Sequence, residues 1–180
     1  MRVIAGVNGG RRLSAPAGRA TRPTSDRVRE AAFSMLASLD AVAGARVWDL
    51  FAGSGAMGIE ALSRGAAHAT FVDSARAALQ ATRANLAQMG YGTDRAEVVG
   101  AEALGWVSGV RDGVDLVIAD PPYAWEGWAQ LLAALSPYRP LVLMETGVAV
   151  ALPPAWSVLK SKRYGGTVVT LARRPPGDDL

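Results

Sequence analysis

Four consecutive residues in the second half of the chain have the right types to hold an amine. Asp120-Pro121-Pro122-Tyr123 follows directly on the apolar run 114–119, which predicts a buried strand. Because prolines lack an N–H donor and stiffen the loop, the Asp120 carboxylate and the Pro121 carbonyl remain as acceptors. These acceptors can take both hydrogens of a planar exocyclic amine, while the Tyr123 ring stacks on the group that carries it. The loop is therefore predicted to aim the lone pair of a nucleobase amine at a methyl group.

A glycine loop earlier in the chain has the pattern of a cofactor-binding turn. Gly53-Ser54-Gly55-Ala56-Met57-Gly58 is a G-x-G-x-x-G between a predicted strand and a predicted helix, and Asp73 lies 20 residues after Gly53. Glycines allow a sharp turn and close approach of a ligand, and an acid on the next strand can accept hydrogen bonds from ribose hydroxyls. The pattern fits dinucleotides as well as other adenosine cofactors, and a tight turn without a ligand is the alternative.

Asp49 favours one class of cofactor over the other. It stands four residues before Gly53, near the carboxyl end of the first strand of this unit. A carboxylate beside a pyrophosphate adds repulsion, whereas S-adenosylmethionine presents an ammonium and a sulfonium. Asp49 could instead be an exposed residue at the strand end. Together with the glycines and Asp73, however, it indicates S-adenosylmethionine.

The composition excludes several kinds of site. The chain has 180 residues, half of them hydrophobic, with no cysteine and a single histidine, His68. Disulfides, thiolate zinc sites and cysteine nucleophiles are therefore excluded, and we expect no metal. No apolar run approaches the roughly 18 residues that a membrane helix needs. We expect a cytoplasmic monomer without membrane contact.

The positive charge is concentrated at the N-terminus. The net charge is +3, yet residues 1–30 carry seven arginines and two acids, which leaves a negative remainder. Arginine binds phosphate bidentately and stacks on bases, so this region predicts contact with nucleic acid, although a solvated basic arm is the alternative. The candidate RNA-binding residues are Arg2, Arg11, Arg12, Arg22, Arg27 and Arg29.

The order of predicted elements indicates an α/β fold. Residues 2–14 predict a hairpin around Asn8-Gly9-Gly10, and a helix capped by Thr24 or Ser25 follows with Val28, Ala32, Met35 and Leu39 on its apolar face. Strands then alternate with helices and glycine turns, which predicts a mostly parallel, seven-stranded sheet with helices on both faces and an antiparallel C-terminal hairpin. The predicted strands are 47–51, 69–72, 96–99, 114–119, 141–145, 156–164 and 167–172, and the helices after the first are 56–64, 75–89 and 125–135.

Several segments of the chain form a combined pattern, of which the run from Arg22 to Glu30 is the most specific part. The other segments are Met1 to Gly6, Gly10 to Leu13, Asp49 to Gly55, Glu60 to Gly65 and Asp120 to Tyr123. Together they resemble the RsmD family, whose members methylate the N2 of a guanine in small-subunit (16S) ribosomal RNA. The resemblance covers nearly the whole chain and is weaker after residue 145.

The resemblance implies a Rossmann-like class I methyltransferase that uses S-adenosylmethionine and acts on the small ribosomal subunit. It implies a basic extension at 1–40, formed by the hairpin arm and helix, joined in one compact unit to a methyltransferase domain at 41–180. The catalytic residues are then Asp120, Pro121, Pro122 and Tyr123. The cofactor-binding residues are Asp49, Phe51, Ala52, Gly53, Ser54, Gly55, Gly58, Asp73, Glu102 and Ala103.

Two positions depart from the family pattern. Glu102 stands near the expected adenine site, where relatives commonly have Asp or Asn, and Ser74 follows Asp73 in place of a further acid. Two side-chain groups have open roles. Trp125 and Trp128 either line the base pocket or cover the sheet, and the basic cluster Lys160, Lys162 and Arg163 contacts either RNA or solvent.

Other functions use parts of the same pattern. An adenine-N6 DNA methyltransferase shares the catalytic loop but usually carries a separate target-recognition domain, for which 180 residues leave little room. A protein-glutamine methyltransferase more often has Asn in place of Asp120. A non-catalytic RNA-binding assembly factor would not need the intact Asp120 to Tyr123 loop and glycine turn.

Overall fold

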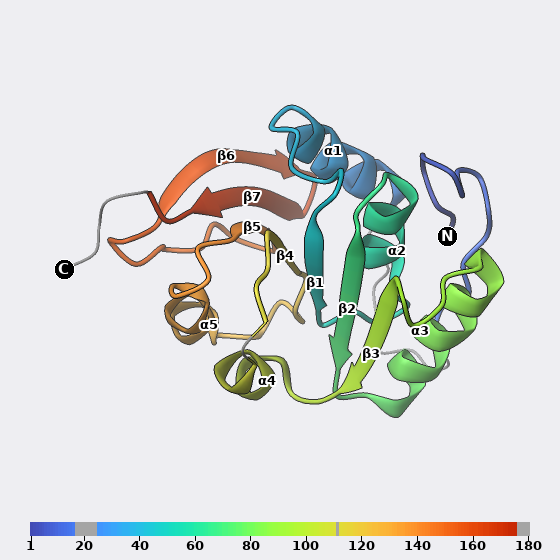
Figure 1. Ribbon diagram of the computed structural model, residues 1–180. Coiled ribbons are helices and arrows are strands. Elements are labelled where there is room, and N and C mark those ends of the chain that lie inside the picture. Colours follow the sequence, from blue (N-terminus) through green and yellow to red (C-terminus); the bar gives the residue numbers. More distant parts are fainter. Residues whose placement is uncertain (17–24, 111, 176–180) are drawn as a thin grey trace.

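A single mixed sheet organises the chain, and its strand order is β3-β2-β1-β4-β5-β7-β6 (Figure 1). The computed structural model describes residues 1–16, 25–110 and 112–175. The first five strands in this order pair in parallel, and β7 is antiparallel to both β5 and β6. The strands are β1 (Arg46–Leu50), β2 (His68–Asp73), β3 (Ala96–Gly100), β4 (Leu116–Ala119), β5 (Leu141–Thr146), β6 (Ser157–Tyr164) and β7 (Thr167–Arg173). The predicted parallel sheet and its C-terminal antiparallel hairpin are confirmed.

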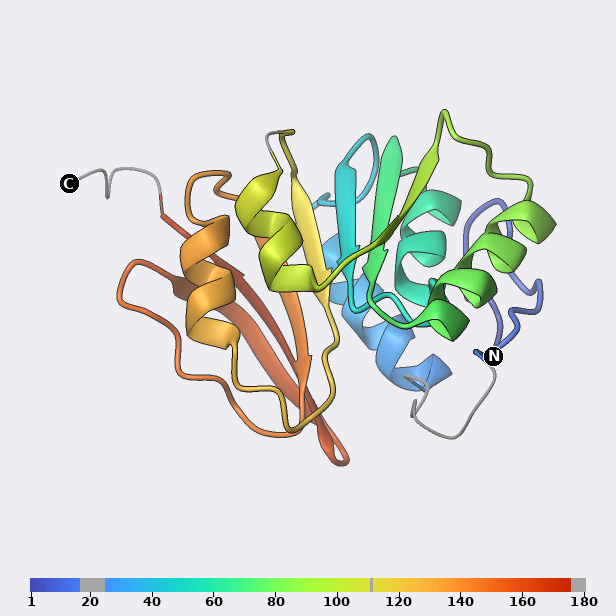
Figure 2. The same ribbon diagram turned by 90° about the horizontal axis from the view of Figure 1, so that it is seen from below.

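Helices cover both faces of the sheet, because its central strands are buried on both sides. In β1, Val47 packs with the core on the α1, α2 and α3 side, and Trp48 packs with the core on the α4 and α5 side (Figure 2). Trp48 contacts the rings of Trp106 and Tyr138 edge-on, with centroids 4.9 and 5.2 Å away. The helices are α1 (Asp26–Ala37), α2 (Ala56–Ser63), α3 (Arg76–Met89), α4 (Ala103–Gly109) and α5 (Trp128–Leu135).

Some predicted elements differ in their limits. The sequence did not predict α4, a helix of 7 residues with Gly105 inside it and Gly109 at its end, which weakens the intrinsic signal for a helix. Helix α5 begins at Trp128 rather than at Trp125. Strand β1 ends at Leu50 because Phe51 adopts a positive φ of 62°.

Helix α1 begins as predicted and buries Val28 and Ala32 of the predicted apolar face, with Met35 partly buried against the core. The Ser25 hydroxyl accepts a hydrogen bond from the Val28 N–H at 3.2 Å. Leu39, expected on the apolar face, lies beyond the end of the helix and is 41% exposed. Phe33 and Leu36 are buried in its place, together with the guanidinium of Arg29.

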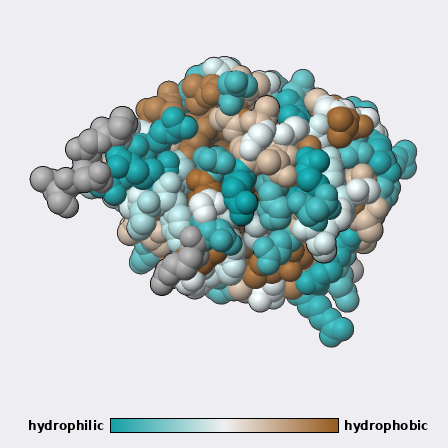
Figure 3. Space-filling model, viewed as in Figure 1, coloured by the Kyte–Doolittle hydropathy of each residue, from teal (hydrophilic) through white to brown (hydrophobic). Residues whose placement is uncertain are grey.

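The described surface is largely hydrophilic on the side drawn in Figure 3, with a hydrophobic area over β6. Val158 and Leu159 of this edge strand are 53% and 45% exposed. Lys160 and Lys162 stand beside them, and charges of this kind protect an edge from pairing with another chain. In the described part of the chain, no helix is long and apolar enough to cross a membrane.

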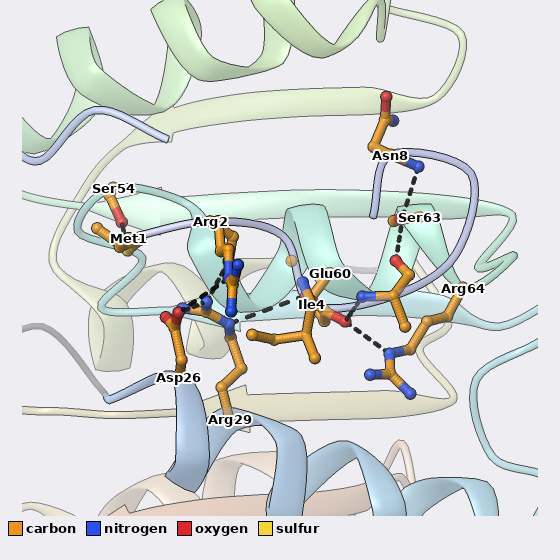
Figure 4. Close-up of polar contacts among 12 residues, drawn as sticks. Met1, Arg2, Ile4, Asn8, Asp26, Arg29, Ser54, Glu60, Ser63 and Arg64 are labelled. Atoms are coloured by element: carbon orange, nitrogen blue, oxygen red, sulfur yellow. Dashed lines mark hydrogen bonds and ion pairs between the residues drawn. The ribbon is translucent and has the colours of Figure 1, made fainter. Parts of the chain in front are cut away.

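The N-terminal segment is attached to α2 by the buried carboxylate of Glu60 (Figure 4). The N–H groups of Ile4 and Ala5 donate to its two oxygens at 2.7 and 3.0 Å. Since these donors are used by a side chain, the predicted hairpin is reduced to one isolated bridge, between Arg2 and Arg12. The segment is therefore docked on the helix layer.

A close backbone contact completes this docking. Gly6 has a φ of +81°, and a Cβ there would lie 1.9 Å from the carbonyl oxygen of Ser63. The N–H of Val7 donates to this carbonyl at 2.9 Å, and the N–H of Asn8 donates to the Ser63 hydroxyl at 3.0 Å. Only glycine fits at position 6 without moving the segment away from α2.

Arg29 joins α1 to the same carboxylate. Its guanidinium is fully buried, donates to Asp26 Oδ1 at 2.9 Å and to the backbone carbonyl of Arg2, and lies 3.9 Å from Glu60 Oε2. Burial lowers the pKa of Arg29, while the charges of Asp26 and Glu60 act in the opposite direction. Arg64 Nε donates to the other oxygen of Glu60 at 2.7 Å. One carboxylate thus connects α1, α2 and the N-terminal segment.

We expect Glu60→Gln to destabilise the protein strongly. Removing one partner of a buried ion pair costs about 3–5 kcal/mol, because the other charge stays buried without compensation. Urea unfolding followed by circular dichroism measures the change. Glu30→Gln is the matched control, since Glu30 is an exposed carboxylate on α1, and it should change stability by less than about 0.5 kcal/mol. Equal midpoints for the two variants would contradict the role given to Glu60.

Candidate functional site

Three chain segments meet at one edge of the sheet because their strands are neighbours. Leu50 of β1 pairs with Val72 of β2 on one side and with Ala119 of β4 on the other. The glycine loop, Asp73 and Asp120 follow directly on these strand ends. In an open α/β sheet, ligands bind at this carboxyl edge. The first turn of α1 lies at the same edge, which faces down in Figure 2.

The glycine loop between β1 and α2 uses left-handed backbone at three positions. Gly53 and Gly55 have φ values of +58° and +76°, where glycine costs little, and Gly55 N donates to Ala52 O at 2.7 Å. Phe51 has a φ of 62°, which is unfavourable for a residue with a side chain. Its ring packs edge-on against Trp125 with centroids 5.0 Å apart, a contact that helps to hold it.

Asp49 is buried beneath this loop. Its Oδ2 accepts a hydrogen bond from Gly58 N at 2.8 Å. Burial raises the pKa of Asp49 to about 8, the hydrogen bond from Gly58 opposes this, and the nearby charges of Asp120 and Asp73 raise it further. A Cβ at position 58 would lie 2.3 Å from the Phe71 ring, so glycine is needed for α2 to approach β2. The carboxyl group therefore lies where a cationic ligand would lower its pKa.

Asp73 holds the glycine loop from the end of β2. Its Oδ2 accepts from Gly53 N at 2.9 Å, and its Oδ1 accepts from Ala75 N at 2.8 Å. Two residues of α3 that were not predicted from the sequence support the same loop. Thr82 Oγ1 donates to Gly53 O at 3.0 Å, and Asn85 Nδ2 donates to Ser54 O at 2.8 Å. Asn85 is fully buried, and a polar side chain within an alanine-rich helix was the available signal.

Glu102 caps α4 in this structure. Its two carboxylate oxygens accept from Leu104 N at 3.1 Å and from Gly105 N at 2.7 Å, and Ala103 is buried beside it. The residue lies after β3, on the expected side of the sheet. Its contact with an adenine stays a prediction.

The loop after β4, predicted to be catalytic, borders a cavity of about 320 Å³. Tyr123 is 51% exposed, and Trp125 N donates to Pro122 O at 2.8 Å, which closes the turn. Trp128 is buried and packs edge-on against Trp125 at 5.2 Å, so the two tryptophans cover the sheet and also line the cavity. The lining residues are 121–126, Trp128 and 145–151.

The predicted RNA-binding arginines differ in their surroundings. Arg2 is 65% exposed, with an ion pair to Asp26 at 3.5 Å, and Arg12 and Arg27 are exposed. Arg11 donates to Asn8 Oδ1 at 2.8 Å and to the carbonyl of Gln88, so it ties the N-terminal segment to α3. Arg22 lies outside the described residues. The prediction that Arg29 binds RNA is wrong, because the structure buries its side chain against Asp26 and Glu60, away from any surface that RNA could reach.

Arg2 and Arg12 line a second, larger cavity of about 630 Å³ together with Met1, Gly10, Leu13 and Asp26. Met1 also connects this region to the glycine loop, since the Ser54 hydroxyl lies 3.5 Å from its sulfur (Figure 4). The other basic cluster is on β6, where Lys160, Lys162 and Arg163 are exposed. The described residues contain no group of three or more His, Asp or Glu side chains that could hold a metal ion.

Comparison with known proteins agrees with this geometry. The chain is 36% identical to ribosomal RNA small subunit methyltransferase D of Escherichia coli strain K12, over 97% of this chain and 90% of the relative. It is 32% identical to the protein of the same name from Haemophilus influenzae, over 92% of this chain and 89% of the relative. The solved structure of yhhF from Escherichia coli superposes with a TM-score of 0.83 at 34% identity and covers 97% of each chain. Residues 1–173 match the family described as Conserved hypothetical protein 95, and the chain belongs to this family, the RsmD family of class I methyltransferases.

Proposed function

We propose that this protein transfers a methyl group from S-adenosylmethionine to the exocyclic N2 of a guanine in 16S ribosomal RNA, in an assembled or partly assembled small subunit. The proposal rests on two loops that lie at the same edge of the sheet because they follow neighbouring parallel strands. The acidic glycine loop follows β1, and Asp120-Pro121-Pro122-Tyr123 follows β4. A methyl donor in the first loop and an amine in the second would be neighbours.

The residues of the glycine loop fit S-adenosylmethionine. Asp49, Asp73 and Asp120 lie close enough for each of the other two charges to raise the pKa of Asp49, so a ligand with positive charge relieves their repulsion. The left-handed Gly53 and Gly55 bring bare backbone to the sheet edge. Asp49 would face the cationic part of the cofactor and Asp73 the ribose. When bound, S-adenosylmethionine supplies a methyl carbon whose bond to sulfur breaks, with the electron pair staying on sulfur.

Asp120 and the Pro121 carbonyl prepare the amine. Its nitrogen is a poor nucleophile because the lone pair is conjugated into the base. Hydrogen bonds from the amine to these two acceptors favour a tetrahedral nitrogen and aim its lone pair at the methyl carbon. In this proposal, Asp120 also accepts the proton that the nitrogen loses. Tyr123, half exposed at the cavity, would stack on the base.

One observation favours ribosomal RNA over DNA, and a second favours a nucleic acid of either kind. The named relatives are ribosomal RNA small subunit methyltransferases and match the chain over almost its full length. Arg2 and Arg12 are exposed beside the cavity next to the glycine loop, where they can contact phosphates. An RNA-binding assembly factor without activity would not need hydrogen-bond acceptors for an amine beside a binding site for a methyl donor.

The proposal predicts which substrate is labelled. The protein is incubated with radiolabelled S-adenosylmethionine and unmodified small subunits, naked 16S RNA or duplex DNA, and the labelled nucleotide is mapped. We expect label on a guanine N2 of the RNA. Asp120→Ala should lower the transfer rate at least about 100-fold, because one acceptor of the amine is lost, with cofactor affinity near that of the wild type.

Label only on DNA adenine would refute the proposed substrate. Full transfer by Asp120→Ala would refute the role of Asp120. Comparing intact subunits with naked RNA decides which of them is the substrate.

The arginines of the N-terminal segment should differ in their effect on RNA affinity. Arg12→Ala removes an exposed charge. It should make the plot of log RNA affinity against log salt concentration less steep, by the amount expected for the loss of about one phosphate contact. Arg11→Ala is the matched control, because Arg11 bonds to Asn8 and Gln88 and its loss should act on stability. Fluorescence anisotropy over a range of salt concentrations measures the slope. An unchanged slope for Arg12→Ala would exclude it as a phosphate contact.

Cofactor binding should depend on pH through Asp49. Its pKa is raised to about 8, so the carboxyl group is largely protonated at pH 6. A cationic ligand prefers the ionised form, and the affinity for S-adenosylmethionine should therefore rise from pH 6 to 8, by at most about tenfold per pH unit. Isothermal titration calorimetry measures the affinity at each pH. Asp49→Asn keeps the acceptor for Gly58 and should flatten the profile. A flat wild-type profile would contradict this role.

A further inference from the structure

The hydroxyl of Tyr123 is anchored by the C-terminal hairpin. It lies 2.9 Å from Oγ1 of Thr167, the first residue of β7. Thr167 is 5% exposed, so bulk water has little access to replace this hydrogen bond. Half of the Tyr123 side chain stays exposed, beside the cavity next to the catalytic loop. One end of the side chain is therefore fixed while the ring remains available.

The ring of Tyr123 also rests against bare backbone. A Cβ at Gly147 would lie 3.1 Å from the Cδ2 atom of the ring, closer than an undisturbed contact allows. The hairpin holds this backbone in place, since Thr146 pairs with Val168 and Arg163 Nη1 donates to Gly147 O at 3.4 Å. The anchor and the support of the ring thus both depend on β6 and β7.

We propose that Thr167 is a positioning residue, whose hydroxyl holds the Tyr123 ring in the orientation that stacks on the target base; this rests on the function proposed above. A free tyrosine side chain turns about two torsion angles, and fixing it costs entropy when the RNA binds. A hydrogen bond made before binding removes part of this cost. Thr167 itself need not contact the RNA or the cofactor.

The test compares variants that remove or keep the hydroxyl. Thr167→Val keeps the β-branched shape, and Thr167→Ser keeps the hydroxyl. Methylation is measured with radiolabelled S-adenosylmethionine and whichever of small subunits or 16S RNA the wild type methylates. We expect Thr167→Val to lower kcat/KM for RNA about three- to tenfold, as the loss of one hydrogen bond does, with the KM for S-adenosylmethionine unchanged and the Tm lowered by no more than about 5 °C. Thr167→Ser should restore the wild-type value.

A double-mutant cycle separates positioning from general damage. Tyr123→Phe keeps the ring and should match Thr167→Val, and the double variant should lose nothing more, because both substitutions break one hydrogen bond. Three outcomes would each overturn the proposal. They are a double variant whose loss of kcat/KM is the product of the two single losses, a Thr167→Val variant with wild-type kcat/KM, and a Thr167→Ser variant whose kcat/KM does not recover. A wild-type protein that methylates no RNA would overturn the proposed function and this inference with it.

Discussion

The buried carboxylate of Glu60 is the interaction on which the arrangement of the N-terminal third depends. A charge without solvent must be paired and hydrogen-bonded, and this one is satisfied by two backbone N–H groups, Arg64 and the nearby Arg29. These partners come from the N-terminal segment, from α1 and from Arg64, the residue that follows α2. Because α2 follows the glycine loop directly, the same carboxylate also fixes the N-terminal segment in relation to that loop.

The contacts of the individual arginines change how the basic N-terminus is interpreted. Counting arginines suggests a free, uniformly basic arm, yet the structure assigns them different tasks. Arg29 pairs with the buried Glu60 and the half-exposed Asp26, the exposed Arg11 bonds to α3, and Arg2 and Arg12 are exposed beside a cavity. The acids Asp49, Asp73 and Asp120 are separate from these arginines, because they lie together at the carboxyl ends of β1, β2 and β4. The exposed arginines Arg2 and Arg12 and the acids at the strand ends thus belong to different segments of the chain, and Asp49 among these acids is buried.

The sequence predicted what depends on local pattern. Apolar runs, glycine turns and the proline pair predicted the sheet, its hairpin and the loops at its edge. Strands and tight turns can be predicted in this way because they depend on residues that are neighbours in the sequence. It did not predict Glu60 as a partner of Ile4, 56 residues away, since nothing local marks such a pair. Helix α4 and the left-handed Phe51 were missed for the same reason: packing against distant residues overrides their intrinsic preference.

The antiparallel strand β7 has a consequence for the site that a fully parallel sheet could not provide. Because β7 runs opposite to β5, its first residues pair with the last residues of β5, as in Thr146 with Val168. Thr167 therefore lies at the edge where β4 ends, within reach of Tyr123. In a parallel strand the beginning would lie at the opposite edge. The reversal of the chain at Gly165 and Gly166 thus brings the start of β7 to the loop that contains Tyr123.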